Sequence, residues 1–178
     1  MLLRKQVLGW LNNVKPKLDD EVMRLLSLLF LMLTWPLQAL ASGDDKEINC
    51  LALNIYFEAR SETHEGQLAV GYVTMNRVVS ERFPDSVCGV VWQRKQFSWT
   101  HDGKSDRPRE KKAWRKAQSI AQYVYSNYHR FMDLTRGATD ITRGALHYYA
   151  PKMADPVWAR EMITVAQIGG HVFLVEDS

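Results

Sequence analysis

The sequence predicts an α+β domain with a mainly helical body and a small antiparallel β element. Helical spacing of apolar residues runs through the chain to about residue 131. After residue 140, short apolar and aromatic runs alternate with glycine and proline, which is typical of strands and turns. With 178 residues, of which 46% are hydrophobic, we expect one domain with a real core and no second full domain.

Three helices are expected in the first part of the chain, over residues 48–60, 65–79 and 110–131. The second has one apolar face, formed by Leu68, Tyr72, Met75 and Val79. The third has a stripe formed by Trp114, Ala117, Ala121, Val124 and Tyr128. Trp92, Trp114 and Tyr128 are expected in the core.

The remaining elements are a loop and three short strands. Residues 93–109 read as a long polar loop with aromatic residues set into it. Residues 144–150 form a strand-like run that Pro151 stops. Residues 164–167 and 171–175 flank a Gly-Gly pair and predict a hairpin.

The first 41 residues predict an N-terminal extension and a signal peptide. A cationic start at Met23 precedes an apolar run too short to span a bilayer comfortably, and Ala39-Leu40-Ala41 has the small residues of a cleavage site. Met23 is a candidate for the true start, and an uncleaved membrane anchor is the alternative. Residues 42–47 read as a short polar linker or mature N-terminus, and residues 48–178 as the domain itself. We therefore expect export, with the periplasm as the destination.

Two cysteines, Cys50 and Cys88, agree with export. An even count in an exported chain indicates a disulfide, which would stabilise the fold by about 4 kcal/mol in the chain-entropy model. Two unrelated buried thiols are the alternative.

The charge of the chain does not favour a nucleic-acid partner. The formal net charge is only +3, and it falls further if the leader is removed. The basic segment at residues 104–116 is interpreted as a solvated loop and helix face, or as a surface attracted to an anionic envelope.

Glu58 is the residue most suggestive of chemistry. It lies four positions after Asn54 in an otherwise apolar stretch, so the two side chains share a helix face. An ionised carboxylate in apolar surroundings is costly unless paired, and the usual result is a raised pKa, as a general acid requires. The alternative is a structural ion pair with Arg60 or Arg77. Asn54 either orients Glu58 or bonds to backbone.

Several ordered motifs resemble the SleB-like cell wall hydrolase family. They are EAR at residues 58–60 followed by a glutamate, EGQLAVGYVTMNRV at 65–78, FPDSVCGVVWQ at 83–93, QFSW at 96–99, GALHYYAP at 144–151, PVWA at 156–159 and IGGHVF at 168–173. The resemblance covers about residues 48–175. The chain departs from the family at Ser61, where the family usually has glycine.

The resemblance implies a lysozyme-like α+β catalytic domain with lytic transglycosylase activity on peptidoglycan, at the bond between N-acetylmuramic acid and N-acetylglucosamine. It places the catalytic acid/base at Glu58 and implies glycan strands as the partner. The chemistry requires no cofactor or metal, and we expect a monomer. The resemblance suggests substrate-binding residues Asn76, Phe97, Ser98, His147 and Tyr148, and for each of them a packing role is the alternative.

One carboxylate is enough for that reaction, whereas a hydrolysing glycosidase normally uses two. Glu62 and Glu65 lie beyond the apolar stretch and are expected to be solvated or to cap a helix. Glu62 as a second catalytic carboxylate, giving hydrolysis, is the less favoured version.

Two rival functions remain open. One is a zinc amidase that uses His64, His147 or His171 with Glu58, although no HExxH spacing is present. The other is a non-catalytic peptidoglycan-binding protein, against which the intact Glu58 argues.

Overall fold

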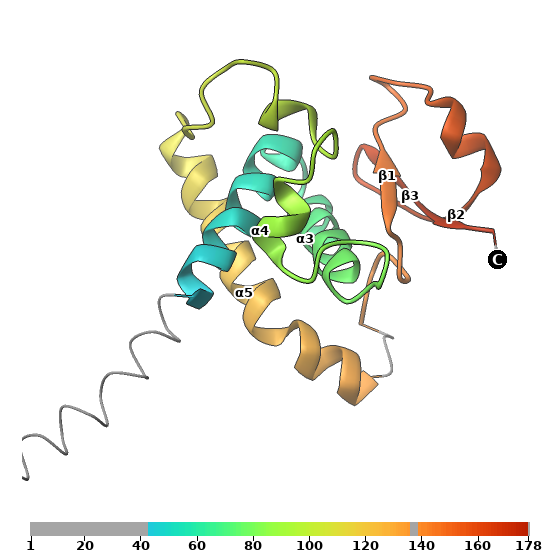
Figure 1. Cartoon of the computed structure of the whole chain (residues 1–178), viewed down its shortest axis with the longest axis horizontal. Helices are drawn as coiled ribbons and strands as arrows, with labels where there is room; N and C mark the ends of the chain where they lie inside the picture. The colour runs from blue at the N-terminus through green and yellow to red at the C-terminus, as the bar shows by residue number, and fades with distance from the viewer. Residues whose placement is uncertain (1–42, 136–138, 178) are drawn as a thin grey trace, which may run out of the picture. The chain divides into compact units, whose positions relative to one another are not determined.

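The computed structural model describes residues 43–135 and 139–177 (Figure 1). The predicted signal peptide and the alternative start at Met23 lie outside these residues and remain predictions. Within the described ranges, no helix has both the length and the apolar character needed to cross a membrane.

Helices form the larger part of the domain. The first covers residues 43–59, and it is followed by α3 (His64–Val78), α4 (Val87–Val91), the short 3-10 helix η1 (Ser98–Thr100) and α5 (Lys111–Thr135). Most of the polar stretch at residues 42–47 is therefore helical, and its interpretation as a linker is wrong. Two of its carboxylates hold it to the domain, because Asp44 accepts from the Tyr125 hydroxyl at 3.0 Å and Glu47 from the Cys88 amide at 3.1 Å.

Helix α3 lies at the centre of the domain and is buried along most of its length. Thr63 caps its start by accepting a hydrogen bond from the Gly66 amide at 3.1 Å. The predicted single apolar face was too narrow, because Ala69 and Val73 are also buried, against the sheet. Val79 follows the end of the helix and is 54% exposed.

Helix α5 packs on α3 with the predicted stripe. Ala117, Ala121, Val124 and Tyr128 are buried, and Trp114 is partly buried against the same core. Trp92 was wrongly placed in the core: it caps the C-terminus of α4 at the surface, is 45% exposed and meets Trp99 edge-on.

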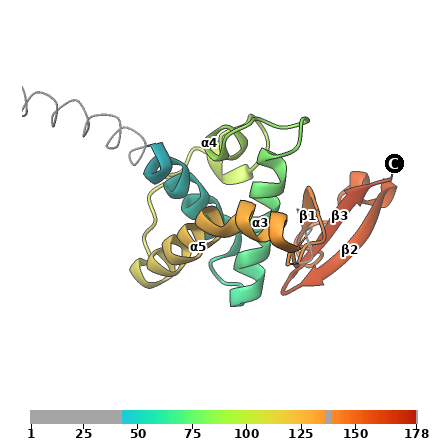
Figure 2. The same cartoon turned by 90° about the horizontal axis from the view of Figure 1, so that it is seen from below.

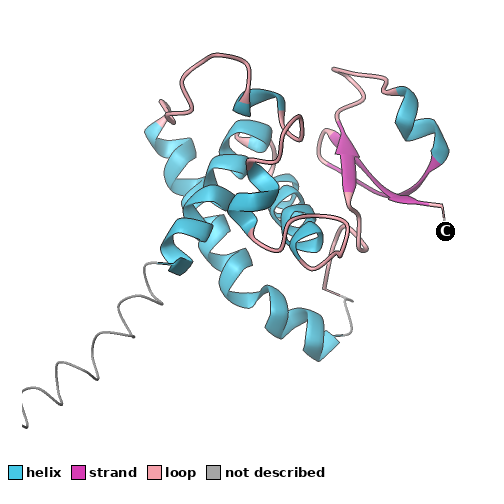
Figure 3. Ribbon diagram, viewed as in Figure 1, coloured by secondary structure: helices cyan, strands magenta, loops and turns pink. Residues whose placement is uncertain are grey.

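The β element is a three-stranded antiparallel sheet in the order β1-β3-β2. Its strands are β1 (His147–Tyr149), β2 (Met162–Ile168) and β3 (His171–Glu176), with the 3-10 helix η2 (Val157–Glu161) before β2. The sheet lies beside α3 in both views (Figures 1 and 2), where Ala69, Val73, Ala145 and Phe173 form a small second core. The predicted α+β class and the hairpin are confirmed (Figure 3).

The disulfide joins Cys50 in the first helix to Cys88 in α4, with a Cα–Cα distance of 5.2 Å. The predicted pairing is thus present in the structure. It ties α4, which buries Val87, Val90 and Val91, to the helix that carries Glu58.

Candidate active site

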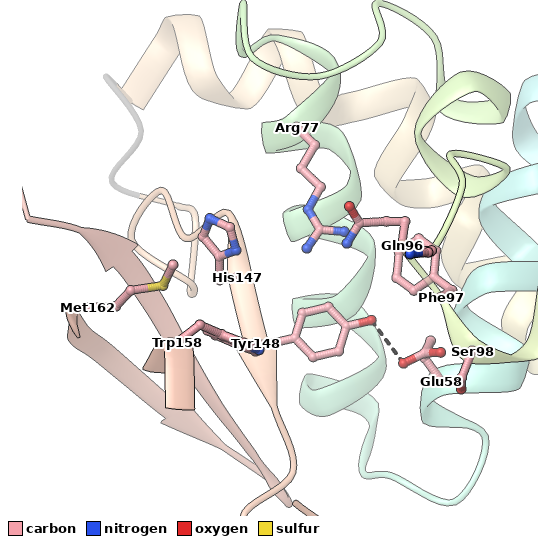
Figure 4. A pocket seen from close by; sticks show the side chains of 10 residues that line it. Glu58, Arg77, Gln96, Phe97, Ser98, His147, Tyr148, Trp158 and Met162 are labelled. Atoms are coloured by element: carbon pink, nitrogen blue, oxygen red, sulfur yellow. Dashed lines mark hydrogen bonds between the residues drawn. The ribbon is translucent and has the colours of Figure 1, made fainter. Parts of the chain in front are cut away.

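A cavity of about 500 Å³ opens between the first helix, the end of α3, the loop before η1 and the sheet (Figure 4). Four of the predicted substrate-binding residues and the predicted acid lie around it. Its lining residues are Glu58, Arg77, Lys95, Gln96, Phe97, Ser98, His147, Tyr148, Trp158 and Met162.

Glu58 enters this cavity from the penultimate position of the first helix. Burial raises the pKa of its carboxyl group, and the Tyr148 hydrogen bond and the charge of Arg77 offset that rise in part. The alternative, a structural ion pair with Arg60 or Arg77, is not formed. Arg60 instead pairs with Glu110 at 3.0 Å, and among the described residues no cation lies within 4 Å of the Glu58 carboxylate. A buried acid with a raised pKa in a pocket is the arrangement that general acid catalysis requires.

Tyr148 is the direct partner of Glu58. Its hydroxyl donates to Glu58 Oε2 at 3.2 Å (Figure 4). Burial, followed by the charge of Glu58, raises the pKa of Tyr148 well above its ordinary value, so the ring stays a neutral donor. The rings of His171 and Phe173 lie behind it at centroid distances of 5.4 and 5.8 Å and hold its orientation.

Asn54 is fully buried. Its Nδ2 donates to Thr74 Oγ1 at 3.0 Å, and Thr74 in turn donates to the Val70 carbonyl at 3.0 Å. Among the described residues, the Asn54 side chain makes no hydrogen bond to Glu58 or to a backbone group. It joins the first helix to α3, a role that sequence spacing did not predict.

Asn76 does not line the cavity, contrary to the prediction. Its Nδ2 lies 3.0 Å from Asp140 Oδ2, 3.2 Å from Thr142 Oγ1 and 3.1 Å from the Ala145 carbonyl. Its Oδ1 accepts from the Tyr128 hydroxyl at 2.7 Å. Because these partners occupy the whole amide, Asn76 joins α3 and α5 to the segment before β1 and has a structural role.

Glu62 is neither solvated nor part of the cavity lining. Its Oε2 accepts from the Gly170 amide at 2.9 Å, and its Oε1 lies 3.9 Å from His171 Nδ1. Gly169 beside it has φ +58°, and a Cβ there would clash with the Glu62 carboxylate. Glu62 thus anchors the β2–β3 turn, and Glu58 is the one carboxylate among the residues that line the cavity. Glu65 is exposed in the first turn of α3, as expected.

The three histidines of the amidase alternative are not brought together. His64 is exposed at the start of α3, His147 lines the cavity, and His171 lies behind the ring of Tyr148. In the part of the chain that the structure describes, no three His, Cys, Asp or Glu side chains are grouped so as to hold a metal ion.

Sequence reasoning missed several lining residues. Arg77 was considered only as an ion-pair partner, and Lys95, Gln96, Trp158 and Met162 were not considered. Trp158 carried a signal, because it lies in the PVWA motif and its ring borders His147 and Tyr149 at 6.0 Å each.

Comparison with known proteins identifies the family of the chain. The sequence pattern of the Cell Wall Hydrolase family matches residues 61–174. This chain belongs to the Cell Wall Hydrolase family. The match begins three residues after Glu58, so the role of that residue rests on the geometry above and on the motif resemblance.

Relatives of this cell wall hydrolase include spore cortex-lytic enzymes. That of Oceanobacillus iheyensis is 32% identical over 127 residues, which cover 71% of this chain and 41% of the relative. That of Bacillus subtilis is 32% identical over 129 residues, covering 72% and 37%. The chain thus spans less than half the length of these relatives.

Two solved catalytic domains have a similar structure. The catalytic domain of the SleB protein of Bacillus cereus has a TM-score of 0.55 at 27% identity, covering 74% of this chain and 91% of that one. The catalytic domain of the germination-specific lytic transglycosylase SleB of Bacillus anthracis has a TM-score of 0.57 at 30% identity, covering 72% and 93%.

The departure of this cell wall hydrolase at Ser61 leaves the site intact. Ser61 is exposed in the turn after the first helix and is not among the described residues with positive φ. A serine therefore fits there without backbone strain.

Proposed function

We propose that this cell wall hydrolase is a lytic transglycosylase that cleaves the bond between N-acetylmuramic acid and N-acetylglucosamine in peptidoglycan. The observation that carries the proposal is the single carboxylate, Glu58, in the cavity lining, with a raised pKa and a tyrosine donor at 3.2 Å. The name of the similar catalytic domain of Bacillus anthracis supports the same reaction.

Glu58 would perform both proton transfers. As the neutral acid it protonates the glycosidic oxygen while the bond from that oxygen to the anomeric carbon breaks. The resulting carboxylate takes the proton from the C6 hydroxyl of the muramic acid as O6 bonds to the anomeric carbon. The sugar ends as 1,6-anhydro-N-acetylmuramic acid, and Glu58 is protonated again. Between the two steps, the Tyr148 hydroxyl and the charge of Arg77 stabilise the carboxylate.

The position of Glu62 supports transglycosylation over hydrolysis. A hydrolytic glycosidase needs a second carboxylate to activate water or to form a covalent intermediate. Glu62 is the nearest candidate in sequence, but its carboxylate is bound to the Gly170 amide of the β2–β3 turn.

The cell wall, on which the family acts, lies outside the cytoplasm. We further propose export to the periplasm, which the predicted signal peptide and the Cys50–Cys88 disulfide support. We propose that the protein acts as a monomer on glycan strands.

The products of digestion test the reaction. The purified chain is incubated with peptidoglycan, and the released fragments are analysed by mass spectrometry. We expect muropeptides lighter by one water than those with a reducing end. Reducing-end muramic acid would instead indicate a hydrolase, new amino termini an amidase, and no fragments a binding protein.

Replacing Tyr148 by phenylalanine tests how the pKa of Glu58 is set. Tyr148→Phe removes a hydrogen bond that lowers this pKa, so the pKa rises further. Activity that needs the neutral acid is present below this pKa and is lost as the pH rises through it. We therefore expect the alkaline limb of the pH–rate profile to move to higher pH, with about a tenfold loss of maximal rate because the carboxylate is less stabilised. An alkaline limb that stays in place would contradict this role of Tyr148.

A further inference from the structure

Arg77 is a buried cation in the wall of the cavity. It lies at the end of α3 and is 3% exposed. Its Nε donates to the Leu146 carbonyl at 2.7 Å. Gln96, with its amide oxygen turned toward the guanidinium, accepts from Nη1 at 3.0 Å and from Nη2 at 3.2 Å. The rings of Phe83 and Phe97 lie 5.2 and 5.5 Å from its central carbon and fix its orientation.

These contacts use three of the five N–H donors of the guanidinium. Figure 4 shows one end of the group against Gln96 and the other directed toward the space near His147 and Tyr148. Two donors are thus left on a rigidly held group that lines the same cavity as Glu58.

The charge of Arg77 has no counter-ion at contact distance. In the described residues, no carboxylate lies within 4 Å of the guanidinium. An unpaired buried charge is costly, so its presence requires a reason. The charge of Arg77 acts on Glu58 from beyond contact distance and lowers the pKa of that carboxyl group. That effect does not require an N–H donor directed into the cavity, whereas the binding of a substrate oxygen does.

We propose that Arg77 recognises the lactyl group of N-acetylmuramic acid, binding its carboxylate or carbonyl oxygen with the remaining N–H donor on the side of the guanidinium that faces the cavity. This inference rests on the proposed function, because it names how the site selects the sugar that becomes the anhydro product.

The chemistry of the substrate supports this assignment. The two sugars of the strand alternate and differ only in the lactyl ether, so a site that cleaves on one side of muramic acid must read that group. A planar guanidinium is the side chain best suited to a carboxylate or carbonyl held in a fixed direction. Binding the lactyl oxygen in the cavity of Glu58 would place the correct glycosidic oxygen at the acid.

The test measures the direct binding of two monosaccharides, free N-acetylmuramic acid and N-acetylglucosamine. Binding is monitored by NMR titration of the isotope-labelled protein. We expect the wild type to bind N-acetylmuramic acid at least about tenfold more tightly. Arg77→Gln should bind both sugars equally, and Arg77→Lys should keep a reduced preference. The matched control Arg115→Gln, at an exposed position of α5, should keep the full preference.

The wild-type protein also tests the proposal without a mutation, should Arg77→Gln not fold. The methyl ester of N-acetylmuramic acid removes the negative charge, and we expect it to bind more weakly than the free acid. Absence of a wild-type preference for N-acetylmuramic acid, or a full preference in Arg77→Gln, would overturn the proposal.

The binding experiment and the digestion experiment test separate proposals, so either proposal can be rejected without the other. Digestion products with reducing ends, together with an intact sugar preference, would reject the transglycosylase reaction alone. Anhydro products without a preference would reject the role of Arg77 alone.

Discussion

Replacing Glu58 by glutamine is expected to lower the rate of glycan cleavage by about three orders of magnitude. The amide has nearly the same shape as the carboxyl group but cannot give a proton to the glycosidic oxygen or accept one from the C6 hydroxyl. General acid–base groups contribute roughly 10²–10⁴-fold to such reactions, and here one residue serves in both steps. Release of soluble fragments from peptidoglycan, quantified by chromatography, measures the loss.

Glu62→Gln is the matched control for this experiment. It makes the same chemical change four residues later, at a carboxylate bound to the Gly170 amide outside the cavity lining. We expect it to keep the rate within about tenfold while lowering stability by about 1–3 kcal/mol, because the partly buried Gly170 amide loses its charged acceptor. Full activity in Glu58→Gln would remove Glu58 from its proposed role. Loss of activity in a folded Glu62→Gln would instead indicate a second catalytic carboxylate and contradict the single-carboxylate reaction.

Removing the disulfide is expected to have the largest effect on stability. Cys50→Ala/Cys88→Ala should lower the free energy of unfolding by roughly 2–5 kcal/mol, because the bond closes a loop between positions 38 residues apart and so restricts the unfolded chain. Urea unfolding of the oxidised wild type and of the double variant measures the difference.

Reduced wild-type protein provides the control. If the cross-link itself carries the effect, the wild type under reducing conditions should unfold near the midpoint of the double variant. Neither cysteine lines the cavity, so the folded double variant should cleave peptidoglycan at close to the wild-type rate in dilute denaturant-free buffer. A stability change below about 0.5 kcal/mol would contradict the expected stabilisation.

The local elements of the fold were predictable because they depend on periodicity and turn chemistry. The stripe of α5, the break between the first helix and α3, and the hairpin around Gly169 all occur as expected. Errors arose where exposure depends on distant packing. Trp92 was expected in the core but lies at the surface. Ala69 and Val73 were not included in the predicted apolar face, yet they are buried against the sheet.

The candidate site was also predictable only where the signal is local. Glu58 could be identified from its near neighbours alone, because a carboxylate is unusual in an apolar stretch of helix. Asn76 and Glu62 were misplaced, because both are polar residues in family motifs whose partners lie far along the chain. Asn76 bonds to residues 64 to 69 positions later, and Glu62 to one 108 positions later.

The sequence by itself determined the helical body, the small β element and the presence of one carboxylate, Glu58, in an apolar stretch of helix. Only the tertiary structure decided which polar groups meet that carboxylate. Tyr148 lies 90 positions after Glu58, and Arg77 reaches the same cavity from a different helix. The physical reason is that periodicity records which faces are apolar, whereas a pKa or a hydrogen bond depends on the neighbours that folding brings within a few ångströms.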